Sequence, residues 1–318
     1  MSTIRQAVVL AAGRGQRLRP LTELRAKPSL PFLGRTLLDR VLDGLAEAGV
    51  ERVLVNLHHA PDSLRAVVAA RDGGPSVELI PEEVLLGTAG PLMAFRSLLD
   101  PEDDFFLVNG DCVQEIDLTA LAADHRSSGA AATLTVRAQS EPGFGCLRVD
   151  DTDRVTTFSV PAEGRPDERH FLSVQAVSPR LLEHLPDGPP RPLETFKEWY
   201  PQAVERGEVI RAHVSDALML AVDSPERYLA STAEELARRG GGPWLETGAE
   251  VGTGTTLDDA SALHASATVG ARCRLTGSVL LPGARVDDDV ELVGCLLGAG
   301  ARIPAGQRLH GACVDGPS

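Results

Sequence analysis

Short β-rich runs alternate with stretches of helical period through the first 239 residues of this chain of 318. In chain order these runs and stretches lie at 7–11, 38–47, 52–57, 62–70, 77–80, 90–98 and 105–108. The alternation is the βαβ rhythm of a sheet whose crossover helices cover both faces. It predicts an α/β fold with a Rossmann-like, open mixed sheet that is largely parallel.

A different period governs the C-terminal part of the chain. Aliphatic residues recur every six positions at Val251, Leu257, Leu263, Val269 and Leu275, and after a shift at Val286, Leu292, Leu297, Ile303 and Leu309. A three-sided coil that points one side chain per side inward needs this spacing, so the pattern resembles the hexapeptide-repeat, left-handed parallel β-helix. The alternative, a meander of ordinary hairpins, would show period two and Asn-Gly turns.

The run Gly240-Gly241-Gly242-Pro243 separates these two periodicities and is typical of a break between elements. A chain of 318 residues is long enough for two hydrophobic cores of about 100–200 residues each. We therefore expect an α/β domain over residues 1–239 and a β-helix domain over residues 245–318. The β-helix is short, and we expect it to serve as a surface for self-association or for association with a related chain.

Composition and charge narrow the class of protein. The formal net charge is −14, which disfavours binding to nucleic acid. The five cysteines are scattered, show no CxxC spacing and leave one over if paired, as expected of reduced thiols in a cytoplasmic protein. No uncharged run approaches the roughly 20 residues that a bilayer span requires, so we expect no membrane segment.

The most informative stretch runs from Val8 to Thr22, where a buried strand leads into a turn rich in glycine and arginine. Small residues let backbone N–H groups approach phosphate oxygens, and arginines supply charge. Leu18 stands where a dinucleotide-binding loop would have its third glycine, and no Gly-Lys-Ser/Thr of a Walker loop is present. The alternative is a tight turn without a ligand, which leaves Arg14, Arg17 and Arg19 unexplained.

These residues resemble the signature of the sugar-1-phosphate nucleotidyltransferase family, the NDP-sugar pyrophosphorylases. Residues 10–22 match L-A-A-G-x-G-T-R-L-x-P-L-T with Gln16 in place of threonine. Further matches follow in order at 27–32, 87–92, 108–111 and 144–145. Within the family, the Asn-x-His-His stretch at 56–59 is similar to that of mannose-1-phosphate guanylyltransferases and N-acetylmuramate-1-phosphate uridylyltransferases.

The resemblance implies transfer of a nucleoside monophosphate from a nucleoside triphosphate to a sugar-1-phosphate, which yields a nucleotide sugar and pyrophosphate. It implies Mg²⁺ as cofactor and GTP, or UTP or dTTP, as nucleotide. The implied catalytic residues are Arg17, Lys27 and Asp111, and Asp111 is also an implied metal ligand. Asp223 is a second candidate metal ligand, because it lies two residues from the place of the family's second metal aspartate. The implied nucleotide-binding residues are Leu10, Ala11, Ala12, Gly13, Gly15, Glu82, Gly87 and Thr88. The implied sugar-binding residues are Asn109, Phe144 and Gly145.

Two of these assignments have structural alternatives. Asp111 follows an apolar strand and suits Mg²⁺ as a hard carboxylate ligand, but it could equally cap a following helix. Glu82 is suited to accept hydrogen bonds from N–H groups of guanine, uracil or thymine, and it suits adenine poorly. Together with Glu83 it could instead be an acidic pair on the surface.

The chain also departs from the family pattern. Val160 stands where the family has the lysine that holds the sugar phosphate, Ala221 where it has the second metal aspartate, and Ser173 where it has glycine. Asp223 lies two residues beyond Ala221 and, in a strand, would point to the same side, where it could take the place of the metal aspartate. Alternatively, it could cap a helix that begins near Pro225. These departures leave a second interpretation open, a noncatalytic regulatory or sensor subunit that binds nucleotide or nucleotide sugar and assembles with an active relative.

Overall fold

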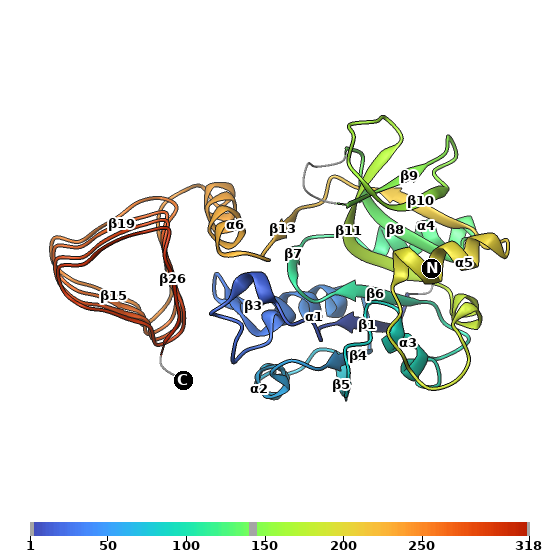
Figure 1. Ribbon diagram of the computed structural model, residues 1–318, viewed down its shortest axis with the longest axis horizontal. Coiled ribbons are helices and arrows are strands. Elements are labelled where there is room, and N and C mark those ends of the chain that lie inside the picture. Colours follow the sequence, from blue (N-terminus) through green and yellow to red (C-terminus); the bar gives the residue numbers. More distant parts are fainter. Residues whose placement is uncertain (1–2, 140–144, 317–318) are drawn as a thin grey trace. The chain divides into compact units, whose positions relative to one another are not determined.

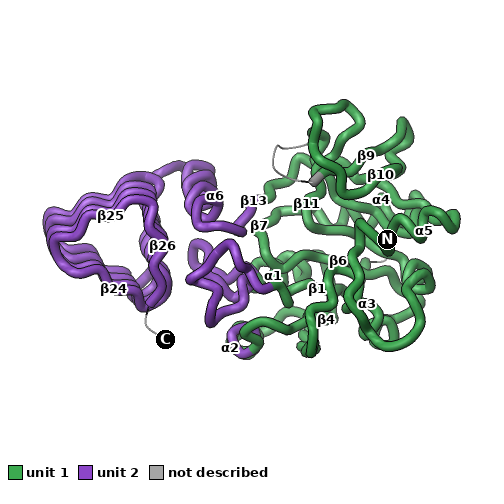
Figure 2. The backbone as a smooth tube through the Cα atoms, in the orientation of Figure 1, with its two compact units in different colours: residues 1–13, 38–61, 65–219 green, residues 14–37, 62–64, 220–318 purple. Residues whose placement is uncertain are grey.

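The computed structural model describes residues 3–139 and 145–316. The chain forms two compact units, shown in green and purple in Figure 2. Unit 1 comprises residues 1–13, 38–61 and 65–219, and unit 2 comprises residues 14–37, 62–64 and 220–318. The units interleave along the sequence, so the domain boundary expected between residues 239 and 245 stays a prediction.

A nine-stranded mixed sheet forms the centre of unit 1. Its strands are β1 (Gln6–Leu10), β4 (Arg52–Leu57), β5 (Ser76–Pro81), β6 (Phe105–Asn109), β8 (Ala132–Arg137), β9 (Gly145–Val149), β10 (Val155–Pro161), β11 (Glu168–Val177) and β12 (Ile210–Val214). Strands β6, β1, β4 and β5 are parallel neighbours, whereas β11 runs antiparallel to β6, β8 and β9. The open, mixed α/β sheet that the sequence predicts is confirmed.

The described residues also form six α-helices, of which the first three begin within one residue of the helical stretches predicted at 38–47, 62–70 and 90–98. They are α1 (Leu37–Glu47), α2 (Pro61–Ala69), α3 (Gly90–Phe95), α4 (Leu118–Ser128), α5 (Tyr200–Glu205) and α6 (Pro225–Arg238). Helix α4 begins at Asp117, whose side chain accepts a hydrogen bond from the Ala120 amide, and it packs against β8 and β11. The core of unit 1 joins residues of β1, β4, β6 and β8 with the buried rings of Trp199 and Tyr200.

Short pieces of chain outside these elements are also regular. They comprise the strands β2 (Pro31–Phe32), β3 (Arg35–Thr36), β7 (Cys112–Gln114) and β13 (Met219–Ala221) and the single turns η1 (Gln16–Leu18), η2 (Lys27–Ser29), η3 (Pro179–His184) and η4 (Thr195–Trp199). Helix α6 belongs to unit 2, where its Tyr228 hydroxyl donates a hydrogen bond to the Pro31 carbonyl oxygen.

The C-terminal part of unit 2 is a parallel β-helix with three sides, seen end-on as a triangle in Figure 1. One side consists of β14 (Trp244–Leu245), β17 (Ala262–Leu263), β20 (Val279–Leu280), β23 (Leu296–Leu297) and β26 (Cys313–Val314). The second consists of β15 (Glu250–Val251), β18 (Thr268–Val269), β21 (Arg285–Val286) and β24 (Arg302–Ile303). The third consists of β16 (Thr256–Leu257), β19 (Arg274–Thr276), β22 (Glu291–Val293) and β25 (Arg308–His310).

The interior of this β-helix is filled by the aliphatic residues of the six-residue period, among them Leu263, Val269 and Leu275. The register explains the shift in that period. Ala262 pairs with Val279, and Val279 with Leu296, so each of these coils takes 17 residues rather than three sixes. In these coils, one corner of the triangle is shorter, and Gly277 and Gly294 form its turns. Their φ angles of 53° and 59° lie in the left-handed region that favours glycine.

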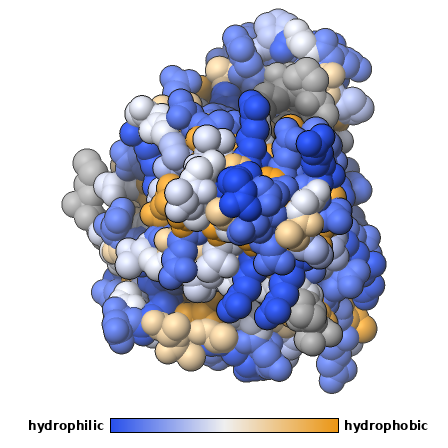
Figure 3. Space-filling model, turned by 90° about the vertical axis from the view of Figure 1, so that its left-hand side faces the viewer, coloured by the Kyte–Doolittle hydropathy of each residue, from blue (hydrophilic) through white to orange (hydrophobic). Residues whose placement is uncertain are grey.

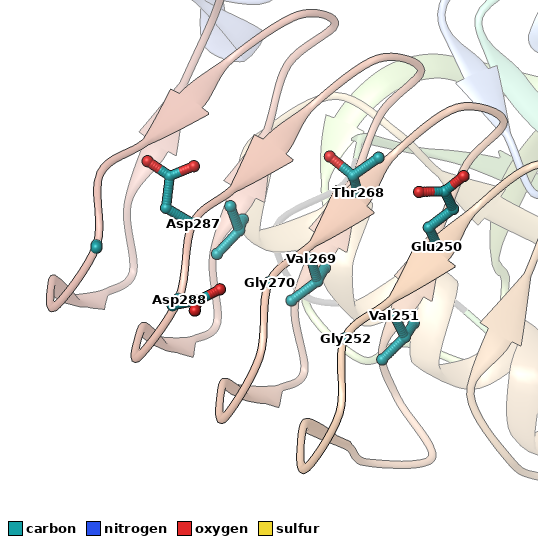
Figure 4. A pocket seen from close by; sticks show the side chains of 10 residues that line it. Glu250, Val251, Gly252, Thr268, Val269, Gly270, Asp287 and Asp288 are labelled. Atoms are coloured by element: carbon teal, nitrogen blue, oxygen red, sulfur yellow. The ribbon is translucent and has the colours of Figure 1, made fainter.

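The outward residues differ among the three sides. On the second and third sides they are polar or charged, and Figure 3 shows hydrophilic side chains over most of the β-helix surface that faces the viewer. Figure 4 shows Glu250 and Thr268 above the strands of the second side and the inward Val251 and Val269 below them, beside a shallow hollow. On the first side the outward Val279 and Leu296 are fully buried, because other parts of unit 2 cover that side.

Residues 14–37 are part of this cover. The ring of Trp244 lies so close to Gly34 that a Cβ there would be 3.2 Å from its Cζ2 atom. A Cβ on Gly298 would lie 2.7 Å from Leu21 Cδ2. The segment that follows the glycine-rich turn therefore packs directly on the β-helix, within one unit.

Candidate active site

The end of β1 is linked to the candidate base-reading residue by a buried asparagine. The amide of Ala11 donates to Asn56 Oδ1 at 2.6 Å, and Asn56 Nδ2 donates to Glu82 Oε1 at 2.7 Å. Glu82 Oε2 accepts from the amide of Leu86 at 3.2 Å. Asn56 is only 1% exposed, so these hydrogen bonds form in a place from which water is largely excluded. Glu82 is therefore part of an ordered network and not one of two loose surface acids.

The pKa of Glu82 is raised. Burial disfavours the carboxylate, while the hydrogen bonds from Asn56 and Leu86 and the nearby His58 act in the opposite direction and do not fully offset it. The His58 ring lies against the same residue, with its Nδ1 atom 3.1 Å from the Glu82 carbonyl oxygen. Sequence analysis noted Asn56 only as part of the Asn-x-His-His stretch, and its place within β4 at the centre of this network was not predicted.

Strand β6 brings Asn109 and Asp111 to the same edge of the sheet. Leu10 is the register partner of Asn109, and the amide of Gly110 donates to the Leu10 carbonyl oxygen at 2.9 Å. A Cβ on Gly110 would lie 2.9 Å from Val9 Cγ1, so only glycine allows this approach. The half-buried Asp111 thus stands at the carboxyl end of the parallel strands, where open α/β sheets bind their ligands.

Thr88 is tied to a distant stretch of unit 1. Its hydroxyl donates to Glu194 Oε2 at 3.0 Å and accepts from the Thr195 amide at 2.8 Å. A Cβ on the neighbouring Gly87 would lie 2.6 Å from the Leu193 carbonyl oxygen. Both residues therefore help to hold residues 193–195 in place. If Thr88 contacts a nucleotide, its hydroxyl has to do so while it is also bonded to Glu194 and Thr195.

In unit 2 the glycine-rich turn is stabilised by hydrogen bonds among its own residues. The Gly15 carbonyl oxygen accepts from the Thr22 hydroxyl at 2.8 Å and from the Leu18 amide at 2.9 Å. A Cβ on Gly15 would lie 3.3 Å from the Cβ of Lys27, which places the stem of this lysine beside the turn. Lys27 is 7% exposed, unlike an average surface lysine.

Arg17 meets Asp223 across 206 positions of sequence. Its Nη2 atom lies 2.7 Å from Asp223 Oδ2, and the same oxygen accepts from Arg227 Nη1 at 3.1 Å. Helix α6 begins beside this group, but its cap is Ser224, whose hydroxyl accepts from the Arg227 amide at 3.3 Å. The alternative role of Asp223 as a helix cap is therefore filled by its neighbour.

The two candidate magnesium ligands differ in chemistry. Asp111 offers a half-buried carboxylate at the sheet edge, which fits a hard divalent cation. Asp223 has a buried Oδ1 without a hydrogen-bond partner, but its Oδ2 holds two guanidinium groups whose charge opposes a cation. Within residues 3–139 and 145–316, no group of three or more His, Cys, Asp or Glu side chains gathers as a metal site.

The predicted site residues are distributed over both units. Leu10, Ala11, Asn109, Asp111 and Glu82 belong to unit 1. Gly15, Arg17, Lys27 and Asp223 belong to unit 2, while Gly13 ends the first segment of unit 1. Of the predicted sugar-binding residues, Gly145 begins β9 and Phe144 lies outside the described residues.

Comparison with known proteins agrees with this geometry. A family model described as nucleotidyl transferase matches residues 6–162. The mannose-1-phosphate guanylyltransferase of Mycobacterium tuberculosis is 30% identical over 305 residues, which cover 92% of this chain and 82% of that protein. The catalytic subunit beta of mannose-1-phosphate guanylyltransferase from Drosophila pseudoobscura pseudoobscura is 26% identical, covering 98% of this chain and 88% of that protein.

A solved structure shares the fold. HddC from Yersinia pseudotuberculosis, crystallised in complex with GMP-PN, matches with a TM-score of 0.60 and 21% identity, over 73% of this chain and 99% of that one. The open α/β sheet, with a glycine- and arginine-rich turn after its first strand, is that of a nucleotidyltransferase. The chain belongs to the sugar-1-phosphate nucleotidyltransferase family. None of the helices in the described part of the chain combines the length and the apolar character needed to cross a membrane.

Proposed function

We propose that this protein transfers GMP from GTP to mannose-1-phosphate, forming a nucleotide sugar and pyrophosphate. The observation that carries the choice of base is the Ala11–Asn56–Glu82 network, which fixes a carboxylate beside the end of β1. The similarity to mannose-1-phosphate guanylyltransferases over nearly the whole chain supports the sugar.

Glu82 is the proposed reader of the base. A carboxylate held by Asn56 and the Leu86 amide keeps further lone pairs with which it accepts from N1–H and the 2-amino group of guanine. Adenine presents an acceptor at N1 and leaves the carboxylate without a matching donor there. UTP and dTTP, which offer a single N–H, are the competing substrates.

The proposed chemistry is an in-line displacement at phosphorus. An oxygen of the sugar phosphate forms a bond to the α-phosphorus, and the bond from that phosphorus to the bridging oxygen of pyrophosphate breaks. No covalent enzyme intermediate is needed, so the chain's task is to align two anions and neutralise their charge. Arg17 can donate two parallel hydrogen bonds to phosphate oxygens, and Lys27 adds a point charge.

Asp111 is the proposed ligand of Mg²⁺. When bound, the ion supplies electrostatic stabilisation of the phosphate oxygens. Asn109 and Gly145 are the proposed contacts of the sugar. We assign the ion to Asp111 and not to Asp223, since Oδ2 of the latter is already paired with two arginines whose positive charge opposes a cation.

A noncatalytic subunit is the second candidate. The replacement of the family's second metal aspartate by Ala221, together with the engagement of Asp223 by arginines, favours it. In that case the chain would bind nucleotide or nucleotide sugar and assemble with an active relative through the β-helix.

Pyrophosphate release by the purified protein with Mg²⁺ separates these candidates. GTP, UTP, dTTP and ATP are crossed with the 1-phosphates of mannose, glucose, N-acetylglucosamine and N-acetylmuramate. We expect release with GTP and mannose-1-phosphate. Pyrophosphate release with UTP alone would overturn the proposed base. If no pair gives pyrophosphate release but calorimetry still detects GTP binding, the noncatalytic subunit is favoured.

A further inference from the structure

One carboxylate oxygen in unit 2 gathers two guanidinium groups. Asp223 Oδ2 accepts from Arg17 Nη2 at 2.7 Å and from Arg227 Nη1 at 3.1 Å. The side chains of Arg17 and Arg227 are 71% and 33% exposed, whereas that of Asp223 is 16% exposed. The acid therefore lies beneath two arginines that a solute can reach.

The charge of this group favours an anion. Two guanidinium groups that share one oxygen repel each other, and a single carboxylate offsets only part of that repulsion. The sum of two positive charges and one negative charge is a net charge of +1. Each guanidinium has five N–H donors in a planar fork. Phosphate oxygens match such a fork.

The backbone at this place also favours an anion. Arg227 lies in the first turn of α6, a helix of 14 residues, and its amide is held by the Ser224 cap. The N-terminal end of a helix carries partial positive charge, which adds to the field of the two arginines. Arg17 comes from a different segment of unit 2, the short helical turn η1 that Gly15 precedes.

We propose that Arg227 is a second phosphate-binding arginine, which forms with Arg17 a site for the pyrophosphate portion of the nucleoside triphosphate. Asp223 is the positioning residue that holds the two guanidinium groups together before the nucleotide arrives. The proposal rests on the proposed nucleotidyltransferase function. In this arrangement, two cationic side chains of a single unit stabilise the negative charge that develops on the leaving pyrophosphate.

The test measures binding without turnover. Isothermal titration calorimetry of inorganic pyrophosphate, GTP and GMP compares the wild-type protein with Arg227→Ala and Arg17→Ala. Arg308→Ala is the matched control, because it removes the same charge from an 80% exposed side chain of unit 2 that faces Glu291 on β22. Thermal melting of each variant reports whether it folds, and Arg227→Gln, which keeps the aliphatic stem, replaces Arg227→Ala if that variant melts early.

We expect Arg227→Ala to weaken the binding of pyrophosphate and GTP by about tenfold to a hundredfold, the loss that follows removal of a charge-assisted hydrogen bond. GMP binding should change by less than about threefold, and Arg308→Ala should match the wild type. Unchanged pyrophosphate and GTP binding in a folded Arg227 variant would overturn the two-arginine site, even if Arg17→Ala weakens both. A wild-type protein that binds no GTP at all would instead contradict the proposed function itself.

Discussion

A single buried side chain, Asn56, organises the end of the sheet to which we assign the nucleotide. It accepts from the Ala11 amide and donates to Glu82, so it joins the end of β1 to the residue assigned to the base. Glycine and arginine signatures are visible in the sequence because their residue types are distinctive. The role of Asn56 is not visible in the sequence, because it depends on a hydrogen bond with Glu82, which lies 26 positions further along the chain.

Replacement of Asn56 by alanine leaves the Ala11 amide and Glu82 Oε1 without their shared partner. We expect the free energy of unfolding to fall by about 1–3 kcal/mol, as for buried polar groups left unsatisfied. The affinity for GTP should fall together with the preference for GTP over ATP, because Glu82 loses its fixed orientation. Denaturant unfolding and calorimetry with both nucleotides measure these effects. A variant that loses stability but keeps the full preference would contradict the link to base recognition.

The raised pKa of Glu82 makes guanine recognition depend on pH. Only the ionised carboxylate accepts from both N–H groups, so GTP affinity should fall as pH drops through the folded pKa, above the pH at which an exposed glutamate titrates. The free energy of unfolding should instead rise as the pH drops through this range. The folded protein takes up this proton before the unfolded chain does, so acidification between the two pKa values favours folding.

Calorimetric titration of GTP across a pH series tests this expectation. Glu82→Gln should abolish the pH-dependent step, whereas the control Glu83→Gln, next to it on the chain, should retain it. A step of equal size in both variants would assign the titration to another group.

At the scale of elements, β11 contains a strained position. Ser173 has a φ of 67° at a point where the register of β11 against β8 shifts between Phe171 and Gln175. The left-handed region costs a residue with a side chain about 1–2 kcal/mol. The motif that the sequence resembles has glycine at this position, so the resemblance pointed to this residue before the structure did.

We expect Ser173→Gly to raise the free energy of unfolding by about 1 kcal/mol, because glycine removes the steric cost of the left-handed backbone. Ser76→Gly in β5 is the control, since its φ is not positive, β5 pairs with β4 without a register shift, and glycine should weaken a regularly paired strand. Equal effects of the two substitutions in denaturant unfolding would show that the backbone at Ser173 is not strained.

Elements whose signal is local were predicted well from the sequence. The run at 105–108 corresponds to β6, and the six-residue period corresponds to the interior of the β-helix. The contact between Arg17 and Asp223 was not predicted, because it joins a loop to the start of α6 across most of the chain. Its position two residues beyond Ala221 made Asp223 a candidate metal ligand, and neither spacing nor composition could reveal that two arginines hold its Oδ2.

At the scale of the whole molecule, residues 14–37 carry Arg17 and Lys27 and belong to the unit that contains the β-helix. Leu21 and Trp244 make this connection through packing at Gly298 and Gly34. The β-helix therefore supports the segment that carries Arg17 and Lys27, a role that the sequence analysis did not predict for it.

A chain shortened to residues 1–239 retains every predicted site residue but lacks the β-helix. We expect it to lose GTP binding or to aggregate, because the fully buried Leu21 and its neighbours lose the surface that covers them. Arg274→Ala, at an exposed position of β19, is the control and should behave as the wild type. A soluble 1–239 chain with undiminished GTP affinity would contradict the supporting role of the β-helix.

The central claim is the transfer of GMP to a sugar phosphate, and GTP labelled with ³²P at the α-phosphorus tests it most directly. The protein is incubated with labelled GTP, mannose-1-phosphate and Mg²⁺, and the products are separated. We predict that the label appears in a nucleotide sugar, with one pyrophosphate released for each molecule formed, and that Asp111→Ala lowers the rate at least a hundredfold, as loss of the proposed metal ligand should. Label that stays in GTP, although the wild-type protein binds GTP, would contradict the account and establish nucleotide binding without transfer.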